Sequence, residues 1–173
     1  MIARTLTQIG GYLKVDNVAI LLATEQIKKV KAKYFRGVNF KDMNLLREIF
    51  TEDVHVDVMG GTTDPVTGIN AVPEATAHVQ DGLSAVIESY AAGTAKIKSV
   101  HHGFMPEIDI IDEHNAKGIW PMFDTLRFHT VLMVELTGFG HYHETYKCVD
   151  GKWKIHTLRL TRLRVDCKLA SKS

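Results

Sequence analysis

The stretch SVHHGFMPEIDIIDEHNAKGIWPMFDTLRF, residues 99–128, decides the fold class of this chain. Apolar and polar residues alternate on both sides of the turn-forming residues 112–115, as in two β-strands joined into a hairpin. The first arm carries His101 and His102, and the second carries Asp124 among apolar neighbours. A hairpin brings a histidine and a carboxylate to one surface. Because histidine titrates near neutrality and a carboxylate can fix its tautomer, this pairing is typical of a proton-transfer site.

The same alternation continues from this stretch to the C-terminal end of the sequence. Asp150–Gly151 is a hairpin turn signal between two long alternating segments. The pattern predicts a largely antiparallel, meander-like sheet with strands at 96–105, 107–112, 115–128, 132–149 and 152–166.

On the N-terminal side of Gly93 the periodicity is helical. Thr24 is the expected N-cap of a long helix that carries Tyr34 on its apolar side and Asn39 near its end. Further helices are expected from Asp42 and over 81–92, with a short strand at 54–58. Helices followed by strands indicate an α+β fold in which the helices cover one sheet face. We expect an N-terminal arm or short helix over 1–22, one domain over 23–166 and a C-terminal tail over 167–173.

The composition is that of an ordinary globular protein, with 45% hydrophobic and 24% charged residues. The 21 basic and 20 acidic residues give a formal net charge of +1, and without a basic tract we expect no nucleic-acid partner. The apolar run Val18–Ala23 is too short to span a bilayer, so no membrane partner or secretion signal is expected. Cys148 and Cys167 form no CxxC motif, which favours reduced thiols and a cytoplasmic location.

Motifs for other kinds of chemistry are missing from the sequence. It has no HExxH, Walker, GxGxxG or GxSxG motif. His141 and His143 share one face of an expected strand, but Glu144 faces the other way, so no metal site is expected. The last expected strand carries three arginines, one of which is a candidate to pair with a carboxylate or to face an anionic substrate: Arg159, Arg162 and Arg164.

One face of the predicted sheet gathers the candidate site residues. His101 shares this face with the even-numbered residues Trp120, Met122 and Asp124, whereas His102 faces away. A helix packed across a curved sheet leaves a cavity at one end, and polar groups that point into an apolar cavity are the usual site hypothesis. The alternatives are a core or solvated histidine, an edge-strand or turn carboxylate and, for Tyr34, a core tyrosine.

The order of these segments resembles the SnoaL-like branch of the nuclear-transport-factor-2-like superfamily. The matching segments are Lys31–Arg36, Asp42–Val54, His101–Ile108, Gly140–Glu144 and Asp150–Ile155. The resemblance covers roughly residues 20–166. It implies a cone-shaped α+β barrel of the cystatin-like type, with N-terminal helices packed on a strongly curved, mostly antiparallel sheet, and it implies self-association as a trimer or dimer.

Within the superfamily, the chain resembles bile-acid 7α-dehydratase and, more distantly, scytalone dehydratase. Such enzymes eliminate water from a ring that carries a carbonyl group, without a metal or an organic cofactor. The resemblance places the site tyrosine on Tyr34, the histidine on His101 and a later aspartate on Asp124. The aspartate of the first helix is replaced by Asn39, which can form hydrogen bonds but cannot exchange a proton.

From this resemblance we expect a cofactor-independent dehydratase or isomerase that acts on a hydrophobic cyclic or polycyclic ketone or enone. His101 would act as general base, Asp124 would hold the imidazole by a hydrogen bond, and Tyr34 would donate to the carbonyl oxygen. The residues expected to bind the substrate are Asn39, Trp120, Met122 and Tyr142.

Other functions are compatible with the same sequence. A polyketide cyclase or epoxide hydrolase would use the same pocket with different proton transfers. A non-catalytic small-molecule-binding or scaffold protein, or an accessory subunit, would share only the fold. The distinguishing observation is whether His101, Asp124 and Tyr34 converge in a closed apolar pocket.

Overall fold

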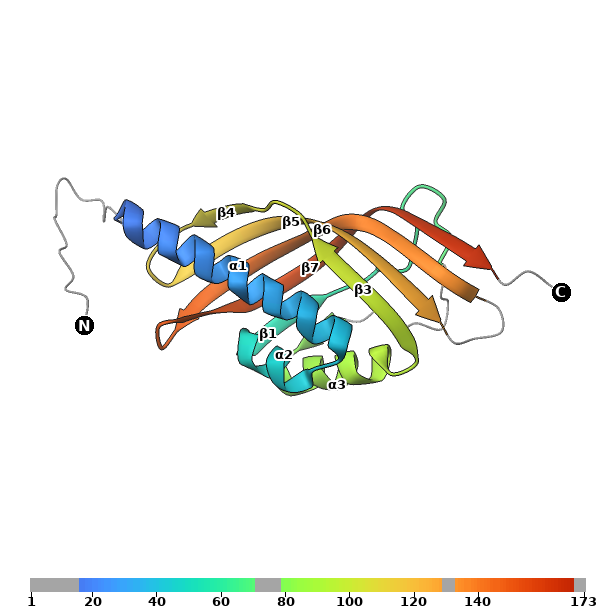
Figure 1. Ribbon diagram of the computed structural model, residues 1–173, viewed down its shortest axis with the longest axis horizontal. Helices are drawn as coiled ribbons and strands as arrows, with labels where there is room; N and C mark the ends of the chain where they lie inside the picture. Colours follow the sequence, from blue (N-terminus) through green and yellow to red (C-terminus); the bar gives the residue numbers. More distant parts are fainter. Residues whose placement is uncertain (1–15, 71–78, 129–132, 170–173) are drawn as a thin grey trace.

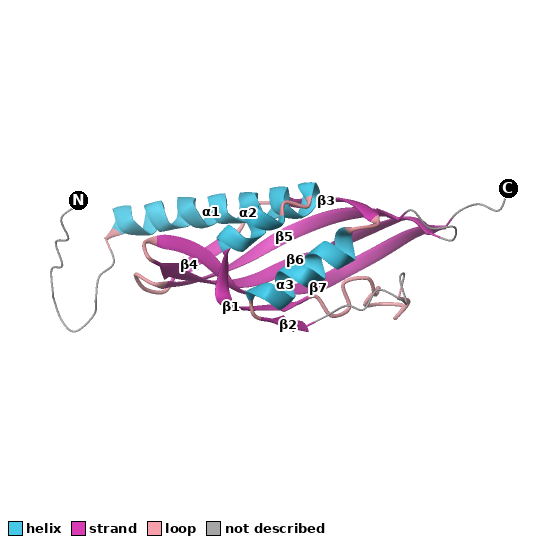
Figure 2. Ribbon diagram, turned by 90° about the horizontal axis from the view of Figure 1, so that it is seen from below, coloured by secondary structure: helices cyan, strands magenta, loops and turns pink. Residues whose placement is uncertain are grey.

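Three helices pack on one large curved sheet in the computed structural model, which describes residues 16–70, 79–128 and 133–169 (Figure 1). Helix α1 spans Asn17–Phe40, α2 spans Met43–Ile49 and α3 spans Leu83–Thr94. Helix α1 runs lengthwise over the sheet, while α2 and α3 lie together near β1 (Figures 1 and 2). The α+β class predicted from the sequence is therefore confirmed.

The sheet has seven strands in the order β2-β1-β7-β6-β5-β3, and β4 also pairs with β5. Only the pairing of β1 with β7 is parallel among these strands; the other pairings are antiparallel. The sheet is therefore mixed but mostly antiparallel. The strands are β1 Phe50–Asp57, β2 Val79–Asp81, β3 Ile97–Gly103, β4 Glu107–Ile110, β5 Asn115–Phe128, β6 Met133–Val149 and β7 Lys152–Leu169.

Helix α1 begins earlier than the sequence pattern predicts. Its N-cap is Asp16, whose side chain accepts a hydrogen bond from the Val18 backbone N–H at 3.1 Å. The expected cap, Thr24, lies within the helix, and its hydroxyl donates to the Ile20 carbonyl at 2.8 Å. The prediction of a cap at Thr24 is wrong because the helix begins earlier, where the Asp16 carboxylate supplies the cap. Of the predicted N-terminal arm, residues 1–15 lie outside the described part of the chain.

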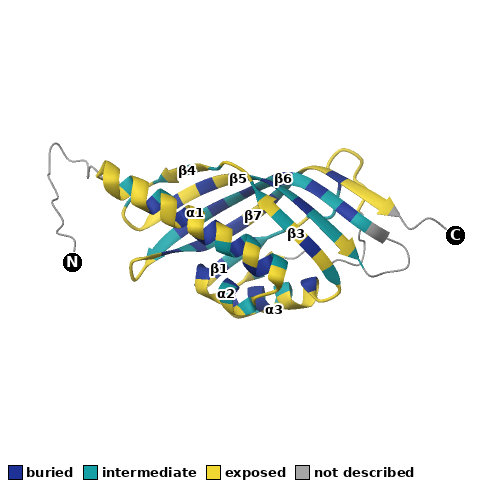
Figure 3. Ribbon diagram, in the orientation of Figure 1, coloured by how far each residue is buried: buried dark blue, intermediate teal, exposed yellow. Residues whose placement is uncertain are grey.

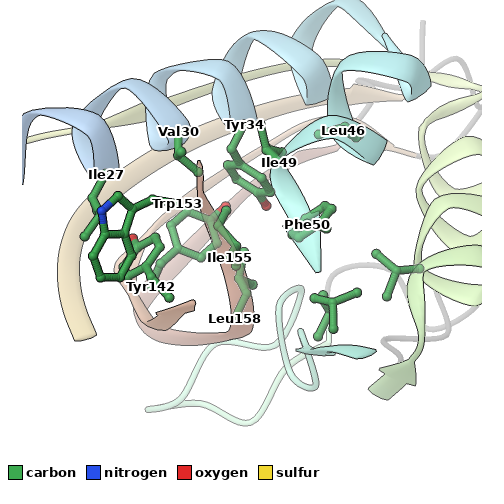
Figure 4. Packing of buried hydrophobic residues seen from close by; sticks show 14 of the residues in the cluster. Ile27, Val30, Tyr34, Leu46, Ile49, Phe50, Tyr142, Trp153, Ile155 and Leu158 are labelled. Carbon is green, nitrogen blue, oxygen red and sulfur yellow. The ribbon is translucent and has the colours of Figure 1, made fainter. Parts of the chain in front are cut away.

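The core lies between the helices and the sheet face that they cover. The predicted apolar face of α1 is buried, with Ile27 fully inaccessible and Tyr34 only 2% exposed. Figure 3 shows buried positions along this helix and along β5, β6 and β7 beneath it. Figure 4 shows how buried side chains of α1, α2, β1, β6 and β7 pack together. Burial of this face is the main stabilising contribution to the packing of α1. No described helix is long and apolar enough to cross a membrane.

Two strands share the outer edge of β5. Strand β4 pairs with β5 up to Ile119, and β3 pairs with it from Met122 onward. Pro121 lies at the junction, where its missing N–H does not interrupt the pairing with either strand. The same register places His101 directly opposite Asp124. This cross-strand pair forms the start of the candidate site.

Candidate functional site

Asn39, in the last turn of α1, holds both the backbone and the ring of His101 in β3. The Asn39 Oδ1 atom accepts a hydrogen bond from the His101 backbone N–H at 2.8 Å, and its Nδ2 donates to the His101 carbonyl at 3.1 Å. These two backbone bonds fix which way the amide points. The ring atom Nδ1 of His101 lies 3.0 Å from the same Oδ1. Because that oxygen can only accept, Nδ1 carries the hydrogen and Nε2 is the basic nitrogen of the neutral ring.

The imidazole of His101 is buried and neutral at neutral pH. Its side chain is 11% exposed. The pKa of His101 is lowered to about 4, chiefly by burial; Asp124 opposes this shift, and the charges of Arg162 and Lys31 contribute to it. The ring can therefore accept a proton at Nε2, and the imidazolium that forms has a carboxylate close by.

Asp124 pairs with an arginine rather than with the histidine. Its two carboxylate oxygens accept hydrogen bonds from the Arg162 guanidinium at 3.1 and 2.8 Å, a bidentate pair that is almost fully buried. The distance from Asp124 Oδ2 to His101 Nε2 is 3.9 Å, which is too long for a hydrogen bond. The predicted hydrogen bond between Asp124 and the imidazole is therefore absent, because Asn39 takes one ring nitrogen and Arg162 takes the carboxylate.

Arg162 is held on several sides. Its Nε donates to the Gly61 carbonyl at 2.7 Å, which ties the guanidinium to the loop after β1. Its Nη1 also lies 3.3 Å from the Met122 Sδ atom. Gly138, opposite Asp124 on β6, leaves the space for this pair, since a Cβ at that position would lie 2.3 Å from both Arg162 Nη1 and Asp124 Oδ1. Of the three arginines in β7, the sequence alone did not identify Arg162 as the one that faces inward.

Tyr34 pairs with a second tyrosine and not with His101. Its hydroxyl lies 3.0 Å from the Tyr90 hydroxyl of α3, and its ring packs edge-on against Tyr142 at a centroid distance of 5.7 Å. Burial raises the pKa of all three phenols, so they stay protonated at neutral pH. Tyr142 is also close enough to Asp124 and Arg162 for their charges to affect its pKa. The three tyrosines thus extend the polar interior from the His101 end along α1.

A buried ion pair lies further along α1 and was missed by the sequence analysis. Lys31 and Glu144 form a salt bridge with both side chains fully inaccessible, and Tyr146 donates its hydroxyl proton to the same carboxylate. The Trp120 indole donates to Tyr146 at 2.8 Å. Burial lowers the pKa of Lys31 to about 8, against the effect of Glu144. The sequence signal that could have revealed the burial of Lys31 is its position, four residues after Ile27 on the apolar face of the helix.

The remaining predicted residues divide between the two faces of the sheet. Trp120, Met122 and Tyr142 are all buried on the inner face. His102 is exposed and stacks on Phe123 of the outer face. Across residues 16–70, 79–128 and 133–169, no group of three or more histidine, cysteine or acidic side chains could hold a metal ion.

The outer face of the sheet also has a hollow, and His143 is one of the residues that line it. This hollow has a volume of about 410 Å³ and includes His143, Thr157 and Arg159 among its lining residues. Here His143 Nε2 lies 3.0 Å from the Thr161 hydroxyl. His101 is not among the residues that line this hollow.

Comparisons with known proteins agree with this architecture. Residues 19–159 match the family model of the SnoaL-like domain. A structure from Novosphingobium aromaticivorans, provisionally named a scytalone dehydratase, has a TM-score of 0.72 and 17% identity, covering 90% of this chain and 94% of that one. The hexachlorocyclohexane dehydrochlorinase LinA-type3 from Novosphingobium barchaimii has a TM-score of 0.70 and 14% identity, with 88% and 94% covered. A Caulobacter vibrioides protein with a cystatin-like fold has a TM-score of 0.59 and 14% identity, with 82% and 89% covered.

Proposed function

Because this chain belongs to the family of SnoaL-like domains, we propose that it is a lyase or isomerase that removes a proton next to a carbonyl group. Two structural neighbours with the same fold bear names that denote eliminations, a provisionally named scytalone dehydratase and a hexachlorocyclohexane dehydrochlorinase, and these names support the reaction class. The proposed substrate is a hydrophobic cyclic or polycyclic ketone or enone that carries a hydroxyl leaving group.

The observation that carries the proposal is the fixed tautomer of His101. Asn39 holds Nδ1–H, so Nε2 offers a lone pair inside a largely buried polar cluster. In the proposed reaction Nε2 takes the proton from the carbon next to the carbonyl, and the substrate becomes an enolate. The imidazolium then lies near the Asp124 carboxylate, whose charge offsets part of the cost of burying the protonated ring.

The second half of the reaction returns the proton. The imidazolium protonates the leaving hydroxyl, the C–O bond breaks with its electron pair on oxygen, and the products are water and a conjugated enone. In an isomerase the same proton would return to another carbon. Atoms and charge balance without a further reactant, and His101 ends in the neutral form in which it began.

The tyrosine pair supports the developing enolate. One proton lies between the Tyr34 and Tyr90 oxygens, so the acceptor of that bond keeps its own O–H for another partner. Burial keeps both phenols protonated, and Tyr34 also interacts with the Tyr142 hydroxyl. In the proposed reaction, the donor to the carbonyl oxygen comes from this group of three hydroxyls. Trp120, Met122 and Tyr142 supply the apolar contacts of the proposed site.

The test compares two neighbouring histidines. His101→Asn keeps a donor where Nδ1 lies and removes Nε2, whereas His102→Asn makes the same change on the outer face. Both variants and the parent protein are assayed for conversion of cyclic β-hydroxyketones to enones by ultraviolet absorbance, and for exchange of the α-hydrogen in D2O by NMR. We expect His101→Asn to lose roughly 10²–10⁴-fold in rate and His102→Asn to stay within about twofold of the parent. Equal rates for the two variants, or no turnover and no exchange by the parent across the panel, would overturn the proposal.

A further inference from the structure

A hollow separate from the His101 cluster lies between α1, the end of α2 and the hairpin that joins β6 to β7. Its volume is about 630 Å³, which is within the range of sites that bind small molecules. Three of its lining residues are buried and apolar: Val30, Ile49 and Trp153 (Figure 4). The hollow therefore has an apolar floor made by the main core.

The rim of this hollow is rich in lysine. The charged residues that line it are Lys29, Lys33, Glu48, Asp150, Lys152 and Lys154. Lys33 is neutralised by Glu48, whose carboxylate lies 3.0 Å away. Within the described parts of the chain, Lys29, Lys152 and Lys154 form no salt bridge, although the charge of Lys152 also acts on Glu48. The hollow is thus lined by four lysines and two carboxylates, those of Glu48 and Asp150. This excess of positive charge around an apolar floor favours an anionic ligand over a neutral one.

We propose that this hollow binds a phosphate-bearing small molecule. The phosphate would lie among the ammonium groups of Lys29, Lys152 and Lys154, since lysine binds phosphate as a point charge. The organic part would lie on the floor formed by Val30 and Trp153. An apolar floor beneath a charged rim suits a ligand that has both parts, such as a nucleotide, better than a free inorganic ion.

The position of the hollow makes this site independent of the proposed catalysis. Lys29 precedes Asn39 by ten residues in the same helix, and this spacing corresponds to about 15 Å along the helix axis. A ligand held at the hollow therefore does not need to reach the His101 imidazole. Binding can be measured whether or not the protein turns over a ketone, so the two proposals can fail separately.

The experiment is a binding titration with two probes, inorganic pyrophosphate and ADP, followed by isothermal titration calorimetry at low and at moderate ionic strength. The variant K152Q/K154Q removes two rim charges. The control K96Q/K98Q removes two exposed charges at the same spacing outside the hollow, so both variants have the same net charge. We expect ADP to bind more tightly than pyrophosphate, and both affinities to fall as salt is added.

The two variants separate a built site from general charge attraction. K152Q/K154Q is expected to weaken ADP binding at least tenfold, and K96Q/K98Q is expected to change it by less than twofold. An equal loss in both variants would overturn the proposal, as would no binding of either probe at millimolar concentration. Tighter binding of a short single-stranded DNA than of ADP, weakened by the same rim substitutions, would replace the small molecule with a nucleic acid and would also overturn it.

Discussion

The Oδ1 atom of Asn39 accepts hydrogen bonds from both the backbone N–H and the ring Nδ1–H of His101, at 2.8 and 3.0 Å. One amide thus joins the end of α1 to β3 and sets the tautomer of the buried imidazole. An aspartate at this position could accept the same two hydrogen bonds with a negative charge, but it could not donate to the His101 carbonyl as Nδ2 of Asn39 does. Asparagine holds the ring without stabilising its protonated form, so the base at Nε2 is positioned but weak.

Asn39→Asp is therefore expected to raise the pKa of His101 from about 4. A carboxylate in contact with a titrating ring shifts its pKa by about one to three units toward the charged form. The pKa is measured from the ring carbon-bound protons by NMR titration, with His101→Asn used to assign the signal. An unchanged pKa would show that Asn39 does not control the ionisation of the ring.

The buried imidazole also predicts how stability depends on pH. The pKa of His101 is about 4 in the folded protein and 6.5 without the fold, so the unfolded chain binds the proton more tightly between these values. The contribution of the neutral His101 imidazole to the free energy of unfolding is fully present above pH 6.5 and is lost as the pH drops toward 4. The loss amounts to about 3 kcal/mol, at 1.36 kcal/mol per pKa unit. Urea unfolding of the parent and of His101→Asn at pH 7.5 and 4.5 isolates this contribution. A parallel pH dependence in the two proteins would contradict it.

The strands and the face of His101 could be predicted from the sequence because alternation is a local signal. The predicted strand at 115–128 matches β5, and the register places His101 opposite Asp124. The parallel pairing of β1 with β7 could not be predicted in this way, since it joins segments about a hundred residues apart and has no local pattern.

The charge pairs in the site could not be predicted from the sequence either, because their partners lie far apart along the chain. Choosing Arg162 from three arginines of β7 required the register of β5, β6 and β7 together with the space left by Gly138. The imidazole contacts Asn39 rather than forming the predicted hydrogen bond with Asp124, because α1 reaches the end of β3. The alternating pattern of a strand contains no information about this packing. The salt bridge of Lys31 with Glu144 likewise depends on how α1 lies over β6.

Breaking the buried pair of Asp124 and Arg162 is expected to cost more stability than replacing it. Asp124→Asn leaves the Arg162 guanidinium buried without a counter-charge, and such changes cost about 3–5 kcal/mol. The double variant Asp124→Leu/Arg162→Met substitutes apolar side chains for both partners and is expected to recover much of that loss. Urea unfolding of Asp124→Leu, of Arg162→Met and of the double variant that combines them measures the coupling. If the double variant loses as much stability as the sum of the single variants, the two side chains do not act as a pair.

Gly138→Ala is expected to disturb this pair although neither of its charged residues is substituted. The new Cβ would lie 2.3 Å from Arg162 Nη1 and from Asp124 Oδ1, so the guanidinium and the carboxylate must both move. Since overpacking of this kind costs about 1–3 kcal/mol, the variant should unfold at a lower urea concentration than the parent. Gly93→Ala is the matched control, because its Cβ meets nothing within 4 Å and alanine favours the α3 helix by up to about 1 kcal/mol. A Gly138→Ala protein as stable as the parent would mean that the Asp124–Arg162 pair tolerates displacement and does not need the space that glycine leaves.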